Sequence, residues 1–265
     1  RDFCLSRGLG DVYKRQVYSY LCELAPLEKQ MSFDNAGFQL GRGSNEVHRA
    51  LLALDVTDDV VREAEELGAE LIISHHPLIF TPVKNLTDCD AGHRRLLELA
   101  AKDIAVISMH TNLDIAEGGV NDVLIRALGA EPECVLDTDG CGRVGTLREE
   151  KDMESFLKQC KAALKVKGLR YYSAGHPVHR LAVMGGSGGD CIDDAYTKGC
   201  DTYVTADIKY HQFLHAAELG INLIDADHFC TEDPVMYSLR DKLSARFPET
   251  EFAVSAVHHQ IIDFI

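Results

Sequence analysis

Long apolar runs are missing from the sequence, and basic residues are scarce in it. The longest apolar stretches, residues 69–73 and 104–109, have the length of strands and fall far short of the roughly 20 residues that cross a bilayer. The sequence therefore predicts no membrane-spanning helix. With 265 residues, of which 46% are hydrophobic, the chain is long enough to bury the core of one large domain or two modest ones.

Lysine and arginine number 27 against 42 aspartates and glutamates, which leaves a formal net charge of −15. This charge opposes attraction to a phosphate backbone, so nucleic acid is not the expected partner. Cys-x-x-Cys pairs are absent, and the nine cysteines are an odd number. Neither a disulfide framework nor a zinc ribbon fits that pattern, whereas thiols packed as small apolar side chains in a reducing compartment do. We expect a soluble cytoplasmic protein.

Residues 1–16 contain two glycines and four basic side chains but no apolar stretch of the kind that a secretory signal needs. We expect them to be a leader foreign to the domain. A first α/β half is predicted for residues 17–130 and a second for residues 131–265, with a closing strand in 251–265 that joins either half. Residues 131–142 are rich in acids, glycine and proline and are predicted to be an irregular linker.

Hydrophobic periodicity predicts two β-α-β units. The first has strands at 51–54 and 70–74 around a helix at 58–67, and it ends in Ser74-His75-His76-Pro77. The second has strands at 180–184 and 202–205, a glycine loop at 185–189 and a helix at 191–198. Side chains beyond the strand ends of an open α/β sheet converge on a crevice, so the position of the histidine pair favours function. The glycine loop either cradles an anion or forms a tight turn, because it lacks the Lys-Ser/Thr of a P-loop.

An internal repeat relates the two halves. Residues 93–114 align without a gap with residues 211–232, and each copy has a histidine, a second histidine 17 residues later and an acid four residues further on. The aligned pairs are His93 and His211, His110 and His228, and Asp114 and Glu232. Each copy is predicted to be a helix, a short strand and then the His-acid pair. The predicted fold class is α/β, with two similar halves related by a pseudo-two-fold axis and their strand ends facing a shared crevice.

Histidine and carboxylate side chains gather at these predicted strand ends. His228 and Glu232 are four residues apart, so they share one face of a helix, and together they suit zinc, manganese or iron. Each motif has a structural alternative: two structural histidines for His75-His76, and a helix cap or surface ion pair for Glu232. Taken together, the groups predict a site for two metal ions. Such a pair lowers the pKa of a water molecule between the ions, which suits hydrolysis.

These motifs resemble the Nif-three-like dinuclear-metal proteins, the GTP cyclohydrolase I type 2 homologues. The resemblance covers nearly everything after Val17. It rests on residues 32–41 (SFDNAGFQLG), Ser74-His75-His76-Pro77, His110-Thr-Asn112-Leu-Asp114, Gly186-Ser187-Gly188, and Asp225-Ala-Asp227-His228 with Glu232. It implies the Nif-three-like fold, the ring-shaped homohexamer of several family members, and two metal ions with a bridging carboxylate, for which the donor types suit zinc, manganese or iron. The metal ligands that it implies are His75, His76, Asp114, His228 and Glu232.

Two positions depart from the family pattern. The family usually has tryptophan where Phe33 stands, and this chain has no tryptophan at all. It usually has glycine where Asp227 stands, and the aspartate either raises metal affinity by its charge or faces solvent. Residues 136–179 are too few for the extra domain that longer relatives carry between the halves.

Further polar residues are candidates for catalysis or substrate binding. His110 is predicted to be a general acid or base, or to orient ligands or water, with a structural histidine as the alternative. The candidates for substrate binding are Asp34, Asn35, Gln39 and His211. Turn formation is the alternative for the first three, because they lie in a loop that contains glycine. His93 and His211 begin their predicted helices and are expected to face the crevice.

Two functions fit the sequence. One is a metal-dependent hydrolase of a nucleotide or related small molecule, which the resemblance to GTP cyclohydrolase I type 2 homologues implies. The other is a non-catalytic metal-binding scaffold, or a regulatory protein that binds a partner. The substrate is not identified, since no motif in the sequence indicates a guanine pocket.

Overall fold

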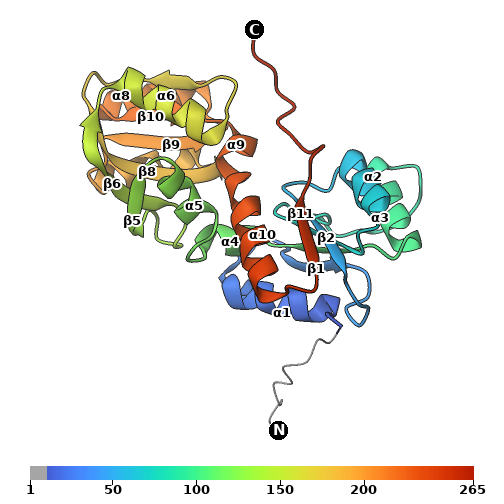
Figure 1. Ribbon diagram of the computed structural model, residues 1–265. Coiled ribbons are helices and arrows are strands. Elements are labelled where there is room, and N and C mark those ends of the chain that lie inside the picture. The colour runs from blue at the N-terminus through green and yellow to red at the C-terminus, as the bar shows by residue number, and fades with distance from the viewer. Residues whose placement is uncertain (1–10) are drawn as a thin grey trace. The chain divides into compact units, whose positions relative to one another are not determined.

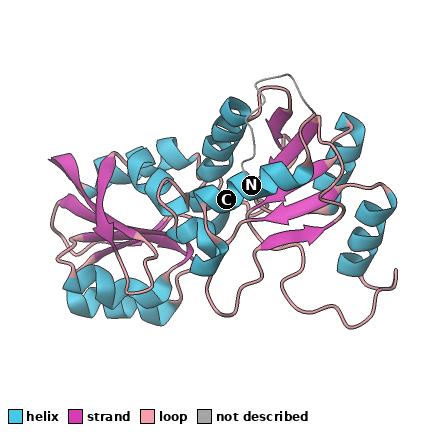
Figure 2. Ribbon diagram, turned by 90° about the horizontal axis from the view of Figure 1, so that it is seen from below, coloured by secondary structure: helices cyan, strands magenta, loops and turns pink. Residues whose placement is uncertain are grey.

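The computed structural model describes residues 11–265, and contacts between residues divide them into two compact units (Figure 1). Unit 1 comprises the described residues up to Glu23, Asn35–Met109 and Leu239–His258. Unit 2 comprises Leu24–Asp34, His110–Ser238 and His259–Ile265. Each unit has one β-sheet, flanked by helices, so the predicted α/β class is confirmed (Figure 2). Within the described part of the chain, no helix is long and apolar enough to cross a membrane.

The sheet of unit 1 has five strands in the order β1-β4-β3-β2-β11. They are β1 Gly37–Leu40, β4 Ala105–Ser108, β3 Leu71–Ser74, β2 Arg49–Ala53 and β11 Glu251–Val254. Strands β4, β3, β2 and β11 run parallel, and β1 is antiparallel to β4. The helices of this unit are α1 Lys14–Leu24, α2 Asp58–Leu67, α3 Ala91–Ala101 and the part of α10 (Pro234–Arg246) from Leu239 onward.

Helix α2 shows how the sequence builds unit 1. Thr57 caps its start by accepting a hydrogen bond from the backbone N–H of Val60, and Gly68 ends it in the left-handed conformation with a φ of 66°. Val60, Val61 and Ala64 form one buried face of the helix. That face packs, together with α3, on β2, β3 and β4. The predicted helix at 58–67 and the strand that leads to His75 are therefore confirmed.

The sheet of unit 2 has six strands in the order β5-β6-β8-β9-β10-β7. They are β5 Ala130–Val135, β6 Arg143–Lys151, β8 Val178–Ser187, β9 Thr202–Ala206, β10 Asn222–Asp225 and β7 Arg170–Tyr172. Strands β8, β9 and β10 run parallel, whereas β5, β6 and β7 pair in antiparallel fashion. The helices are α4 Thr111–Ile115, α5 Val120–Ala127, α6 Met153–Leu164, α7 Ile192–Thr197, α8 Tyr210–Leu219 and α9 His228–Glu232, with 3₁₀ turns η1 Leu27–Lys29 and η2 Gly189–Cys191.

Alternate residues of the central strands of unit 2 belong to two different cores, as the pleat of a sheet requires. Leu181 and Val204 pack with α5, α6 and α9 on one face of the sheet. Ala182 and Tyr203 pack with α7 and α8 on the other face. The central strands of the sheet are thus covered on both faces, and the polar groups described below are found beyond the ends of these strands.

The internal repeat corresponds to the same succession of elements in both copies. α3, β4 and the single-turn helix α4 make up one copy, and α8, β10 and the single-turn helix α9 make up the other. In each sheet, the strand of the repeat (β4 or β10) is the last of a set of parallel neighbours. A short antiparallel strand, β1 or β7, pairs with its other edge. The helix, strand and His-acid pair predicted for each copy are therefore present.

Three segments differ from their predicted structure. Residues 131–142 were expected to be irregular, but β5 occupies 130–135 as an edge strand, where Pro132 is tolerated at a shift in strand register. The predicted glycine loop at 185–189 is partly strand, because β8 continues to Ser187. The closing strand is short: β11 spans only Glu251–Val254, and it joins β2 of unit 1.

The division between units also differs from the predicted one. The predicted boundary follows residue 130, whereas unit 2 takes over the chain at His110. The reason is that α5 packs on β5 and β8 of the second sheet. Residues 1–10 of the predicted leader lie outside the described residues. Within the rest of that leader, α1 already begins at Lys14, whose side chain is buried and whose Nζ donates to the carbonyl oxygen of Asp103 at 3.0 Å.

Candidate metal centre

In unit 1, two adjacent imidazoles follow the end of β3. His75 is fully buried and its Nδ1 donates to the carbonyl oxygen of Met109 at 2.8 Å. His76 is partly exposed and its Nδ1 donates to Oδ1 of Asp55 at 2.8 Å. The two ring centroids are 4.9 Å apart, and one nitrogen from each ring lies within 4.8 Å of the other. Unit 1 therefore offers a pair of imidazole donors at one strand end.

In unit 2, the two His-acid pairs of the repeat lie on the single-turn helices α4 and α9. Carboxylate oxygens of Asp114 and Glu232 lie within 4.8 Å of each other, although the residues are 118 positions apart in the sequence. On α9, Nε2 of His228 is 3.2 Å from Oε2 of Glu232, four residues away. The repeat thus brings its two acids together, and one imidazole with them.

All four histidines at these strand ends use Nδ1 in the same way. Each Nδ1 faces an oxygen that can only accept a hydrogen bond, so Nδ1 carries the proton. The acceptors are the Met109 carbonyl for His75, Asp55 for His76, Asp34 for His110 and Asp207 for His228. In the neutral ring the lone pair is then on Nε2. Metal-binding histidines have this arrangement, with an oxygen holding one ring nitrogen while the other binds the ion.

His228 lies between two carboxylates. Burial by itself lowers the pKa of its imidazole, but the hydrogen bonds and charges of Glu232 and Asp207 outweigh burial and raise the pKa to about 9. At neutral pH the metal-free ring therefore carries a proton on Nε2 as well. A metal ion at that nitrogen would have to displace this proton, so binding of metal to His228 releases a proton.

Glycines of β8 make the room that Glu232 and His228 occupy. A Cβ on Gly186 would collide with Oε1 of Glu232 and come within 3.2 Å of Cε1 of His228. The backbone of Gly186 is held there by two threonine hydroxyls: its N–H donates to Thr231 at 3.0 Å, and its carbonyl accepts from Thr205 at 3.2 Å. Its φ of 65° is in the left-handed region that favours glycine. Position 186, which we call the cradle of Glu232, therefore requires glycine for two reasons: the space that Glu232 occupies and the backbone conformation.

The donor chemistry fits a divalent metal of the zinc, manganese or iron type. Imidazole nitrogens and carboxylate oxygens are present, and no thiolate is among them. The described cysteines form no disulfide with one another, and burial raises the pKa of the Cys160 and Cys200 thiols to about 12. Such thiols stay protonated at neutral pH, as expected for the small apolar side chains that the sequence analysis predicted.

His110 and Asp34 form a tight pair in unit 2. The carboxylate of Asp34 accepts from Nδ1 of His110 at 2.8 Å and from the backbone N–H of Thr111 at 3.0 Å, and it also accepts from the Thr111 hydroxyl. Burial by itself raises the pKa of Asp34, but these hydrogen bonds and the nearby imidazole outweigh burial and lower the pKa to about 2. The pair therefore anchors the loop before β1 to the start of α4.

This depressed pKa predicts an acid-sensitive contribution to stability. A carboxyl whose folded pKa lies below its ordinary value of 3.8 stabilises the fold above about pH 4, and that contribution is lost as the pH falls to about 2. We expect Asp34→Asn to lower the free energy of unfolding by about 2 kcal/mol at pH 7 and to flatten the dependence on pH between 4 and 2. Urea unfolding at several pH values measures both.

The control is Asp152→Asn, which removes a carboxylate that caps α6 by accepting from Ser155. That residue is exposed, so its loss should cost less, and the acid-sensitive contribution of Asp34 should remain. An Asp34→Asn protein with the acid dependence of the wild type would contradict the assignment.

Asn35 and Gln39, two of the other predicted substrate-binding residues, bond to each other and to Ile79. Asn35 donates to the carbonyl oxygen of Ile79 at 2.6 Å, and Gln39 accepts from the N–H of Ile79 at 3.1 Å and donates to the carbonyl oxygen of Asn35. These bonds hold a loop of unit 1, which agrees with the structural alternative. His211 is exposed in the first turn of α8, and His93 is partly buried in α3.

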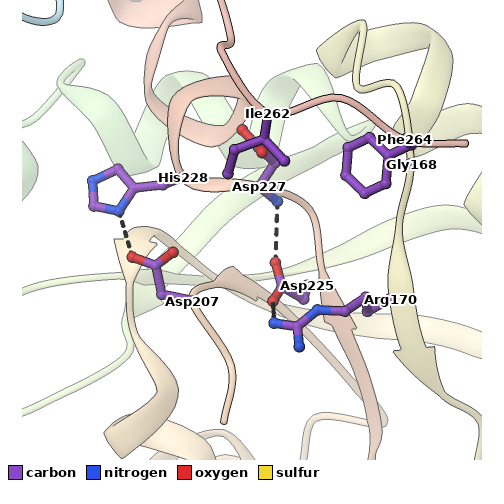
Figure 3. Close-up of a pocket in the computed structure, with 8 residues that line it drawn as sticks. All are labelled: Gly168, Arg170, Asp207, Asp225, Asp227, His228, Ile262 and Phe264. Atoms are coloured by element: carbon purple, nitrogen blue, oxygen red, sulfur yellow. Dashed lines mark hydrogen bonds and ion pairs between the residues drawn. The ribbon is translucent and has the colours of Figure 1, made fainter.

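Asp227 does not face solvent. It is 8% exposed, its Oδ1 accepts from the backbone N–H of Cys230 at 3.1 Å and so caps α9, and its Oδ2 accepts from Gln260. Its φ of 71° explains why glycine suits this position. With Asp207 and His228 it lines a cavity of about 230 Å³, which Phe264 and Ile262 border (Figure 3).

Two aspartates with a direct contact to the predicted ligands were not predicted from the sequence: Asp55, which holds His76, and Asp207, which holds His228. The sequence does contain a signal for them. Each aspartate lies 21 residues before its histidine and comes directly after an apolar stretch, 51–54 or 202–206. A search for carboxylates next to predicted strand ends would have found both.

The fold and these groups define a two-unit α/β protein in which each unit has candidate metal-binding side chains at its strand ends. The chain belongs to the Duf34/NIF3 (NGG1p interacting factor 3) family, whose model matches residues 12–262. The predicted family is therefore confirmed.

Known relatives match the chain over most of its length. It is 35% identical over 257 residues to a Clostridium perfringens protein named GTP cyclohydrolase 1 type 2 homolog, covering 94% of this chain and 98% of that one. It is 35% identical over 222 residues to the GTP cyclohydrolase 1 type 2 of Helicobacter pylori strain J99, covering 82% and 86%. The crystal structure of Staphylococcus aureus hypothetical protein SA1388 superposes with a TM-score of 0.90 at 27% identity, covering 97% of this chain and all of that one.

Proposed function

We propose that the chain binds two divalent metal ions through His75, His76, Asp114, His228 and Glu232 and hydrolyses a nucleotide or related small molecule. One observation carries the proposal. The Nδ1 atom of each of the three histidines donates to an oxygen acceptor, which leaves Nε2 for an ion. The close approach of Asp114 and Glu232 supports it, since paired carboxylates favour a cation between them. The names of the Helicobacter pylori and Clostridium perfringens relatives support a nucleotide as substrate.

When bound, two ions of this kind would lower the pKa of a water molecule to near neutrality and stabilise negative charge on the attacked atom. The chain's own residues would hold the ligands and move the protons. His110 resembles the predicted ligands in having its Nδ1 proton held by a carboxylate, that of Asp34. Its Nε2 would accept or donate a proton during hydrolysis, and Asp34 would stabilise the imidazolium that forms.

Turnover by metal-loaded protein tests the catalytic part. Protein loaded with manganese, iron or zinc should hydrolyse at least one member of a panel of nucleoside triphosphates, including GTP, and phosphoesters. We expect His110→Gln to lower kcat by about 10²- to 10⁴-fold while the metal content stays unchanged, because general acid-base catalysis contributes that much. Fully loaded wild-type protein with no turnover on the panel would favour the second function, a metal-binding scaffold or regulator.

We also propose that the chain forms a homohexamer, which the family resemblance supports. Light scattering on the purified protein measures the mass directly, and the 29.3 kDa mass of one chain at micromolar concentration would contradict the hexamer.

We propose the cytoplasm as the location of the protein. The protonated thiols described above suit a reducing compartment.

A further inference from the structure

Two β-α-β units of the protein place an aspartate and a histidine in the same way. In β2-α2-β3 of unit 1, Asp55 follows the first strand and His76 follows the second. In β9-α8-β10 of unit 2, Asp207 follows the first strand and His228 follows the second. The two strands of each unit are parallel neighbours. Because neighbouring strands lie about 4.8 Å apart, side chains just beyond their carboxyl ends are within hydrogen-bonding reach.

The hydrogen bonds in the two units also have nearly the same geometry. Oδ1 of Asp55 is 2.8 Å from Nδ1 of His76, and Oδ2 of Asp207 is 2.7 Å from Nδ1 of His228. Both distances are those of charge-assisted bonds. The aspartate of unit 1 also has a third group beside it, since Nε2 of His258 lies 3.1 Å from its Oδ2.

The backbone at Asp207 adds a second observation. Its φ of 55° puts it in the left-handed region, where residues other than glycine are uncommon. Such a conformation is strained for a residue with a side chain, and it persists where the surroundings require it. Here it turns the chain directly after β9 and directs the carboxylate to His228, along the wall of the cavity in Figure 3.

We propose that Asp55 and Asp207 are positioning residues for metal binding: each fixes the ring of its histidine and keeps the proton on Nδ1, so that Nε2 is the nitrogen that binds an ion. The proposal rests on the metal-binding part of the proposed function. It assigns a role to two residues that bind no ion themselves, and it explains why both β-α-β units place an acid beyond the first strand.

Cobalt(II) binding by calorimetry and by its visible spectrum tests the proposal on the full chain. We expect Asp55→Ala and Asp207→Ala to lower the cobalt affinity about 10- to 100-fold, the usual effect of losing such a carboxylate. Asp207→Asn should recover part of the affinity, because its amide oxygen still accepts from Nδ1. The matched control is Asp193→Ala, which removes a carboxylate 2.9 Å from Nε2 of His215 in the same unit and should change nothing.

Long-range ¹H–¹⁵N spectra of the metal-free protein separate this proposal from the proposed function. The wild type should show hydrogen-bonded Nδ1 protons on His76 and His228, and each alanine variant should lose the corresponding signal while its circular dichroism stays native. The positioning role is overturned if an alanine variant keeps the Nδ1 signal of its histidine. It is also overturned if a variant loses that signal but binds cobalt with full affinity. Wild-type protein that binds no cobalt would overturn the proposed metal site and, with it, this role at the metal, whatever the spectra show.

Discussion

Glu232→Gln is expected to remove most of the metal that the purified protein holds. Glu232 is 4% exposed, lies 3.2 Å from His228 and has an oxygen within 4.8 Å of one from Asp114. Glutamine keeps the shape but is neutral and a much weaker metal ligand. We expect the content to fall from about two ions per chain to fewer than about one, measured by mass spectrometry of the metals after dialysis.

This loss should not come from unfolding. In the metal-free protein, neutralising Glu232 removes its ion pair with His228 but also its repulsion of the Asp114 carboxylate, so the free energy of unfolding should change little. The control is Glu154→Gln, which breaks an exposed ion pair with Lys158 on α6 and should leave the metal content unchanged. A Glu232→Gln protein that retains both ions would exclude this residue as a ligand.

Gly186→Ala is expected to affect stability and metal binding together. The added Cβ would collide with Oε1 of Glu232, and the φ of 65° is unfavourable for alanine. We expect a loss of about 3 kcal/mol in the free energy of unfolding, combining backbone strain with overpacking. Because Glu232 must move to make room, metal affinity should fall at least about tenfold, as after displacement of any metal ligand.

Gly199→Ala provides a control with the same backbone strain but no collision. Gly199 has a φ of 72°, and nothing lies within 4 Å of the Cβ that it would acquire. This variant should lose only about 1 kcal/mol and bind metal like the wild type. If the two alanine variants had equal stability and equal metal affinity, the cradle around Glu232 would not need glycine at position 186.

The predicted elements that proved correct were those whose signal is local. The helix at 58–67 has a capping Thr57 and a terminal Gly68, and its buried face repeats with the helical period. The elements of the internal repeat were also predicted correctly, because both copies keep a helix, a strand and a His-acid pair at the same spacing. The strand β5 was missed, since Pro132 and its acids resemble a loop and only pairing with β6 makes it a strand.

The sequence by itself determined the family, the α/β class and the choice of His75, His76, Asp114, His228 and Glu232 as candidates, because these depend on residue type and spacing along the chain. Only the tertiary structure decided which oxygen holds each imidazole and which nitrogen stays available. Asp55 meets His76, and Asp207 meets His228, because neighbouring parallel strands end side by side. Strand pairing is a contact between distant segments, and no local pattern encodes it.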